Sequence, residues 1–230
     1  MAKIDIWLAN QLPDMQKSMT VLNGVDFLHI STDQAIKKMR PRIGFRQMKV
    51  EDRTIPRICG ASNLVGCIYG HTAVRDTYVD HYAGLRSDKW NGVFAVYKMP
   101  VDAVIKPSKR LVPDAPQTGE IWIVPYAPEM YEIVPNRVGT MLLHNTTSSI
   151  VNGAVTIKNI FYLKVDAEFK VADKKVSPGF YQFVLMGELT AYGGKPMEPV
   201  QSLSTLSAGE WNTALSKLRA VAKERAEAAN

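Results

Sequence analysis

The stretch Val25-Asp26-Phe27-Leu28-His29-Ile30-Ser31-Thr32 decides the expected fold. Its first six residues form a compact, β-favouring run, and the two hydroxyl side chains that follow can cap a helix. We therefore expect a strand followed by a helix over residues 33–39, which Pro41 would end. This strand-to-helix step favours a module of mixed α+β structure.

Further strand and helix signals follow along the chain. A short strand over Arg57–Gly60 leads to Ser62, which we expect to cap a helix that runs through Tyr69. Runs rich in β-branched and aromatic residues predict further strands of one sheet, at Gly92–Pro100, Val101–Ile105 and Glu120–Tyr126. The proline-dense stretch that contains Pro107, Pro113 and Pro116 predicts a loop, since proline lacks the N–H that a strand ladder needs.

The composition changes after His144, where a polar stretch over Asn145–Ser149 precedes a second strand-rich region. We expect strands at residues 154–165, 169–172 and 179–189, and a terminal helix that begins with the capping-box pair Ser207 and Glu210. The predicted organisation is an N-terminal arm (residues 1–24), an α+β module (25–144) and a β-rich C-terminal appendage with a terminal helix (145–230).

Composition indicates a globular protein, because 46% of the 230 residues are hydrophobic and 22% are charged. The longest apolar runs are too short for a membrane span, and no secretory signal is visible, so we expect a soluble, cytoplasmic protein. A net charge of +6 favours anionic partners, but the basic residues are scattered, which is typical of a solvated surface. Cys59 and Cys67 are expected to be reduced thiols, and we expect no metal site, because no spacing suggests zinc.

The candidate chemistry lies in four motifs in a fixed order. His29 and Ser31 sit two residues apart in the first strand, and Arg42 follows the next predicted helix. The string Ile58-Cys59-Gly60-Ala61-Ser62-Asn63-Leu64-Val65-Gly66-Cys67-Ile68-Tyr69 joins a strand to an aromatic residue, and Glu120 opens a late strand. This order and spacing resembles the ADP-ribosyltransferase superfamily, in its diphtheria-toxin and poly(ADP-ribose) polymerase branch.

The resemblance implies a split β-sheet module that binds NAD, as a substrate, and transfers ADP-ribose to a protein or nucleic-acid acceptor that the sequence does not identify. Glu120 would be the catalytic carboxylate, which steadies the positive charge that develops on the ribose. His29, Ser31 and Arg42 would hold the riboses and the pyrophosphate. Tyr69 would stack on nicotinamide.

Two positions depart from that branch and favour a second hypothesis. Ile30 replaces a glycine between the histidine and the serine, and Gly66 replaces a serine three residues before the tyrosine. Residues 41–59 and 105–120 also resemble uncharacterised bacterial and phage proteins. The alternative is a catalytically inactive structural or interaction protein, such as a homo-oligomer or a phage virion or assembly component, located in the virion or the host cytoplasm.

Each candidate residue also has a structural interpretation: a solvated strand start for Glu120, a core aromatic for Tyr69 and a surface residue for Arg42. Nucleic-acid binding is the weakest hypothesis, because no recognition motif is present.

Overall fold

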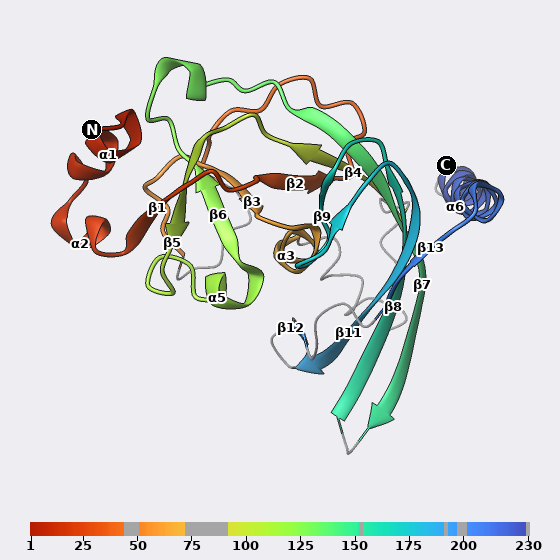
Figure 1. Ribbon diagram of the computed structural model, residues 1–230. Coiled ribbons are helices and arrows are strands. Elements are labelled where there is room, and N and C mark those ends of the chain that lie inside the picture. Colours follow the sequence, from red (N-terminus) through yellow and green to blue (C-terminus); the bar gives the residue numbers. More distant parts are fainter. Residues whose placement is uncertain (44–50, 72–91, 152–153, 191–192, 197–201, 229–230) are drawn as a thin grey trace. The chain divides into compact units, whose positions relative to one another are not determined.

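The computed structural model describes residues 1–43, 51–71, 92–151, 154–190, 193–196 and 202–228 (Figure 1). The chain is of the mixed α+β class, rich in strands, and its paired strands run antiparallel. It folds into two compact units. Unit 1 comprises Met1–His29, Ala35–Gly70 and Tyr97–Asn136, and unit 2 comprises Ile30–Gln34, His71–Val96 and Arg137–Asn230.

Unit 1 contains strands in the hydrogen-bonded order β1-β5-β6-β3-β2, with short helices around them. The elements are α1 (Lys3–Ala9), α2 (Pro13–Gln16), β1 (Met19–Asn23), β2 (Leu28–Ser31), β3 (Ile58–Ala61), α3 (Leu64–Gly70), β5 (Ala103–Pro107), α5 (Ala115–Thr118), β6 (Glu120–Ile123) and the 3₁₀ helix η1 (Pro128–Met130). β2 begins in unit 1, and its last two residues belong to unit 2. The strands predicted near residues 57–60, 101–105 and 120–126 are confirmed as β3, β5 and β6.

The first 24 residues, expected to form an arm, contribute to the core of unit 1. β1 pairs with β5 along its whole length, from Met19 opposite Pro107 to Asn23 opposite Ala103. Ile4, on α1, is 1% exposed and belongs to the same core cluster as Trp122. Sequence periodicity missed this role because α1 and α2 are too short to show a repeating apolar face.

The helix expected over residues 33–39 is absent: the chain makes a turn and then runs extended. Met39 exchanges two backbone hydrogen bonds of 2.8 Å with Ile133, and the Ile36 N–H donates to the Tyr97 hydroxyl at 3.1 Å. A helix this short is marginal by itself. Backbone pairing with a distant segment therefore replaces it.

Helix α3 forms where the sequence predicts it, but with a different cap. Asn63, rather than Ser62, accepts a hydrogen bond from the Gly66 N–H, at 2.9 Å from its Oδ1. Gly66 also sets how closely α3 approaches the sheet: a Cβ at this position would lie 2.7 Å from the Ala61 Cβ and 2.5 Å from the Thr118 carbonyl oxygen. A glycine is required there for packing, because any side chain would force α3 outward.

Gly60 makes a similar close approach, which gives a testable prediction. A Cβ at position 60 would lie 2.3 Å from the Leu28 carbonyl oxygen and 2.4 Å from the Phe27 ring. We expect Gly60→Ala to lower the free energy of unfolding by about 1–3 kcal/mol, because backbone and ring must shift. Gly70→Ala is the control, since a Cβ there meets nothing within 4 Å. Urea denaturation of both variants measures the difference, and equal stabilities would contradict the packing described.

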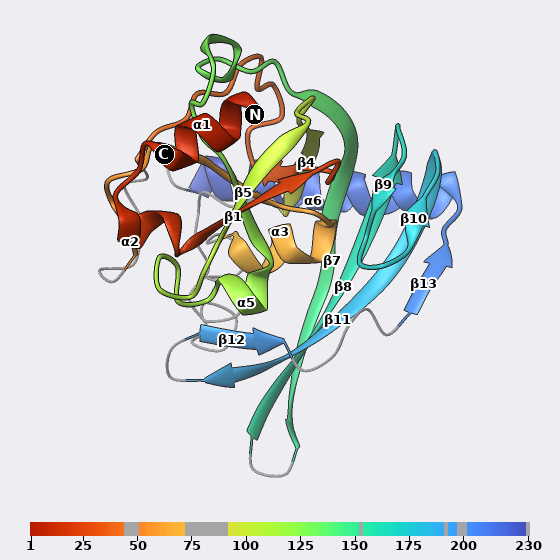
Figure 2. The same cartoon turned by 60° about the vertical axis from the view of Figure 1, so that its left-hand side comes forward.

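Unit 2 is built on long strands that run side by side (Figure 2). Their order is β4-β7-β8-β11-β12, with β13 also paired to β11. The elements are β4 (Val93–Lys98, whose first four residues belong to unit 2), β7 (Asn136–Val151), β8 (Ala154–Val165), β9 (Phe169–Lys170), β10 (Lys175–Val176), β11 (Gly179–Thr190), β12 (Gly193–Pro196), β13 (Ser202–Thr205) and α6 (Ala208–Ala228).

The local predictions for this region are confirmed. β8, β9 and β11 occupy the strands expected at 154–165, 169–172 and 179–189. The capping box of α6 is present: the Glu210 N–H donates to the Ser207 Oγ at 3.2 Å, and the Ser207 N–H donates to the Glu210 Oε2 at 2.9 Å. Helix α6 packs on the sheet through Trp211 and Ala214, which share a core cluster with Leu142.

The change of composition at His144 falls inside β7 and coincides with a bulge. The register between β7 and β8 shifts between Leu143 and Asn145, so that Leu143 pairs with Phe161 and Asn145 with Ile160. The strand then continues through the polar residues Asn145–Ser149 and ends with Ile150 and Val151. Among the helices within the described ranges, none combines the length and the apolar composition that a membrane crossing requires.

Candidate functional site

The pairing of three strands in unit 1 fixes which face each predicted site residue occupies. β3 pairs with β2 through Ala61 and Leu28, and with β6 through Ala61 and Glu120. Residues directly opposite each other in a sheet point to the same face, and neighbours along a strand alternate. Glu120 therefore shares a face with Ala61 and Leu28, whereas His29 faces the other side. The structure does not bring these two side chains onto one face.

The packing around Gly60 agrees with this assignment. The Phe27 ring lies where a Gly60 side chain would be, so Phe27 occupies the face opposite to Leu28 and Ala61. His29, two residues after Phe27, lies on the same side as that ring.

His29 has a defined polar environment on its own face. Its Nδ1 lies 2.9 Å from the Cys59 carbonyl oxygen. Since a carbonyl only accepts, Nδ1 carries the proton and donates. Burial lowers the pKa of His29, and the positive charge of Arg42 lowers it further, so the ring is neutral at pH 7. His29 and Arg42 are thus near each other, while the Arg42 side chain is exposed and its backbone bridges to Arg57.

The contacts of Ser31 and the position of Tyr69 are those of residues that stabilise local structure. The Ser31 Oγ accepts a hydrogen bond of 3.1 Å from the Asp33 N–H, which stabilises the turn after β2. Ser31 belongs to unit 2 and the other four candidates belong to unit 1. Tyr69 is partly buried near the end of α3, whose Gly66 packs against Ala61.

Glu120 lies in a compact group that we call the Glu120 cluster, formed by Glu120, Trp122, Cys59 and Arg57. The Trp122 Nε1–H donates to the Glu120 Oε1 at 2.5 Å. The Cys59 thiol hydrogen-bonds to the same carboxylate, from the strand position opposite Trp122. Trp122 is fully buried in the core of unit 1, so Glu120 satisfies an indole N–H that would otherwise be buried without an acceptor.

Arg57 anchors the cluster, although sequence analysis did not select it as a site residue. Its side chain is 1% exposed, and its Cζ lies 4.2 Å from the centre of the Trp122 ring, in a cation–π arrangement. Nη1 donates to the carbonyl oxygens of Asp52 at 2.9 Å and Ile55 at 3.2 Å, and Nη2 lies 3.6 Å from the Glu51 carboxylate. The sequence did contain a signal for this role of Arg57: the adjacent acidic residues Glu51 and Asp52 lie a few positions before it, and Arg57 directly precedes a strand.

The electrostatics of the cluster disfavour nucleophilic chemistry. Burial raises the pKa of Glu120, against the opposing effects of Trp122, Cys59 and Arg57. The pKa of the Cys59 thiol is raised strongly, first by desolvation and then by the charge of Glu120, although part of the residue is exposed. A reactive cysteine needs the reverse, a depressed pKa that favours the thiolate. The cluster therefore holds β3 and β6 together and keeps its thiol protonated.

This coupling predicts the effect of removing one charge. Glu120→Gln should accelerate alkylation of Cys59 by iodoacetamide at pH 8 several-fold, because losing the carboxylate lowers the thiol pKa and enlarges the thiolate fraction. Mass spectrometry of the modified peptide follows the rate. Cys67 does not interfere, since burial raises its pKa to about 12. Cys59→Ser is the labelling control, and an unchanged rate in Glu120→Gln would show that the two groups are not coupled.

Within the described ranges, no group of three or more His, Cys, Asp or Glu residues could hold a metal ion. Two further histidines make aromatic contacts: the His71 ring packs edge-on against Phe94 with ring centres 5.6 Å apart, and the His144 ring stacks on Tyr162 with ring centres 4.1 Å apart. Comparison of the chain with protein-family models, with curated proteins and with solved structures found no match.

Proposed function

We propose that the chain is a non-catalytic assembly protein that associates with further copies of itself through the outer part of β7. The observation that carries this proposal is the edge formed by Asn145–Val151, which we call the distal edge of β7. β8 pairs with one side of this segment, and β4 lies beside β7 on the other. The described contact there joins the Gly92 carbonyl oxygen to the Leu143 N–H, before the distal edge begins, and for Asn145–Val151 the described residues show pairing with β8 alone. An unpaired edge offers backbone N–H and C=O groups to a strand from another molecule.

The composition of the distal edge suits pairing. The segment reads Asn145-Thr146-Thr147-Ser148-Ser149-Ile150-Val151 and contains neither a charged residue nor a proline. Lysines, inward charges and prolines are the devices with which proteins usually block edge-to-edge association. Four side chains of known exposure lie open to solvent, namely Asn145, Thr147, Ser149 and Ile150, and Ile150 is 78% exposed. Such an edge is suited to pairing with another strand.

The lack of charge along the distal edge, together with the symmetry of antiparallel pairing, permits a second copy of the chain as the partner strand. The net charge of +6 makes two copies repel each other over most of their surface. At an uncharged edge this local repulsion is absent, and antiparallel self-pairing about a two-fold axis matches each edge with an identical one. The Thr146 Oγ1 donates to the Asn159 Oδ1 at 2.7 Å. This bond fixes the segment to β8 in an extended conformation, which is the conformation that pairing with another strand requires.

The surroundings of the candidate catalytic residues support a non-catalytic role. His29 and Glu120 face opposite sides of the strands that carry them, and Glu120 is committed to Trp122 and Cys59. Transfer of ADP-ribose needs the carboxylate beside the bound ribose. The split sheet of the ADP-ribosyltransferase superfamily, and NAD as substrate, stay predictions that rest on motif order.

Sedimentation velocity tests self-association over a range of micromolar concentrations. We expect the mass of the wild type to rise with concentration, and the double variant Asn145→Lys/Ser149→Lys to remain monomeric, because like charges on paired edges repel. Gln117→Lys/Thr213→Lys adds the same charge at exposed positions elsewhere and should behave as wild type. A wild type that stays monomeric throughout would refute the proposal, as would a lysine variant that associates like the wild type.

A thermal-shift titration with NAD separates the catalytic hypothesis from the assembly proposal. A ligand that binds only the folded chain raises the melting temperature. We expect no shift at millimolar NAD. A shift that Tyr69→Ala abolishes would instead favour the ADP-ribosyltransferase hypothesis.

A further inference from the structure

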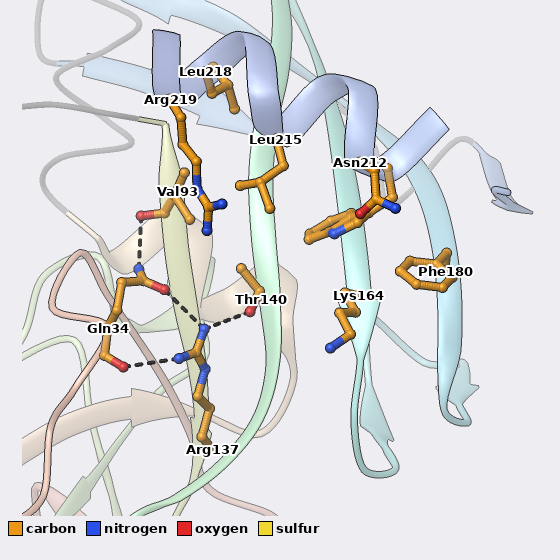
Figure 3. Close-up of a pocket in the computed structure, with 11 residues that line it drawn as sticks. Gln34, Val93, Arg137, Thr140, Lys164, Phe180, Asn212, Leu215, Leu218 and Arg219 are labelled. Atoms are coloured by element: carbon orange, nitrogen blue, oxygen red, sulfur yellow. Dashed lines mark hydrogen bonds between the residues drawn. The ribbon is translucent and has the colours of Figure 1, made fainter. Parts of the chain in front are cut away.

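Unit 2 contains a pocket of about 550 Å³ between helix α6 and the strands beneath it (Figure 3). This volume lies within the range of small-molecule sites in proteins. Polar and apolar side chains line it in about equal numbers. They are Gln34, Val93, Arg137, Thr140, Lys164, Phe180, Trp211, Asn212, Leu215, Leu218 and Arg219. None of them carries a carboxylate.

Arg137 is fixed in this pocket by uncharged groups. Its Nη1 donates to the Gln34 carbonyl oxygen at 3.0 Å, and its Nη2 donates to the Gln34 Oε1 at 3.1 Å and to the Thr140 Oγ1 at 2.8 Å. Gln34 is itself held, because its Nε2 donates to the Val93 carbonyl oxygen at 3.2 Å. A guanidinium has five N–H donors, so this network orients the group and leaves donors for a ligand. An oriented donor loses less entropy on binding.

The positive charge in the pocket is only partly balanced. Lys164 pairs with Asp166 at 3.0 Å, at the protein surface. Within the described part of the chain, neither Arg137 nor Arg219 has a carboxylate within 4.0 Å. Figure 3 shows Arg219 extending from α6 toward the strands, while Arg137 extends from β7 toward the same space. Two guanidinium groups that extend toward the same space without a counter-charge are suited to binding an anion.

The rest of the wall is apolar. Leu215 and Leu218 line the pocket from α6. Trp211 and Phe180 also line it, with their ring centres 5.9 Å apart. Trp211 is 3% exposed, so it is a fixed part of the wall. An apolar surface next to oriented cations suits a ligand with an anionic head and an apolar or aromatic body.

We propose that this pocket binds a small organic anion whose acidic head group, a carboxylate or a phosphate, lies between Arg137 and Arg219 and whose apolar body packs against Leu215, Leu218 and Phe180. This site is separate from the assembly edge of β7 and does not depend on it. Arg219 carries the clearest test, because its exposed side chain makes no hydrogen bond or ion pair within the described residues, and its loss should leave the fold intact.

The probe is 8-anilinonaphthalene-1-sulfonate, with the neutral N-phenyl-1-naphthylamine as its uncharged analogue. We expect saturable binding of the sulfonate by fluorescence, weakened about tenfold in Arg219→Gln and in Arg137→Gln, since each variant removes a charge-assisted contact. Binding of the neutral probe should stay within about twofold of wild type. Arg110→Gln in unit 1 removes the same charge at a residue that does not line the pocket, and it should change neither affinity.

Displacement experiments then identify the head group. Phenyl phosphate and dodecanoate are each titrated against the bound sulfonate, and displacement by the first indicates a phosphate and by the second a carboxylate. Failure of both to displace the probe would overturn the proposal, and so would unchanged sulfonate affinity in Arg219→Gln. Equal loss of both probes in that variant would also overturn it, because the arginine would then act on packing rather than on charge.

Discussion

Trp122→Ala is expected to lower the free energy of unfolding by about 3–5 kcal/mol, the usual range for removing a buried aromatic side chain. Trp122 is fully buried among the apolar residues of unit 1. The truncation leaves a cavity, removes the ring beneath Arg57 and leaves the half-buried Glu120 without its indole donor. Urea denaturation followed by circular dichroism measures the loss.

Trp122→Phe is the matched control for this prediction. It keeps most of the apolar volume and a ring for Arg57, and loses the hydrogen bond to Glu120. We expect it to lose about 1–2 kcal/mol. If the free energy of unfolding fell no further in the alanine variant than in the phenylalanine variant, Trp122 would not be the centre of this core.

The second large effect is expected for Arg57→Met, which should lower the free energy of unfolding by about 3–5 kcal/mol. The Glu51 and Asp52 side chains are only 15% and 11% exposed, and methionine would leave their charges without a buried counter-charge. The loop carbonyl oxygens that accept from Nη1 would lose their donor as well. Chemical denaturation provides the value.

Arg57→Lys separates charge from geometry in this prediction. Lysine keeps the positive charge but not the planar fork that contacts two carbonyls and a ring, so its loss should be intermediate. A double-mutant cycle of Arg57→Met with Trp122→Phe measures the coupling of the two side chains. A loss of less than about 1 kcal/mol in Arg57→Met would mean that the arginine does not anchor the loop over residues 51–55.

Those elements of the fold that carry their own local signals could be predicted from the sequence. β8 and β11 have long apolar, β-branched runs, and α6 has a capping box, so each was found near its observed bounds. β1 and the extended chain over residues 33–39 are set by partners far along the sequence, namely β5 and Ile133. The secondary-structure propensity of a segment depends on its own residues and carries no information about such distant partners.

The separation of His29 and Glu120 onto opposite faces has a related cause. Glu120 and Trp122 are two residues apart on one strand, so their shared face follows from the sequence alone. The face of His29 depends on the register of β2 against β3, and a shift of one residue would reverse it. The motif order could suggest that His29 and Glu120 meet, but not the register that separates them.

The two departures from the ADP-ribosyltransferase pattern have packing explanations. Ile30 is 2% exposed and belongs to the core, and Gly66 is the residue that allows α3 to approach Ala61 and Thr118. A serine at position 66 would force α3 away from the sheet. These positions therefore follow the needs of this fold rather than those of nicotinamide binding.

Amide hydrogen exchange of the full chain, compared at low and high protein concentration, tests the assembly proposal most directly. The account predicts that amides within Asn145–Val151 that point away from β8 exchange quickly in dilute solution and become protected as the chain associates, while Asn145→Lys/Ser149→Lys shows no such protection at either concentration. If these amides exchange equally fast at both concentrations while sedimentation shows that the wild type associates, then the copies meet at another surface and the distal edge of β7 is not the interface.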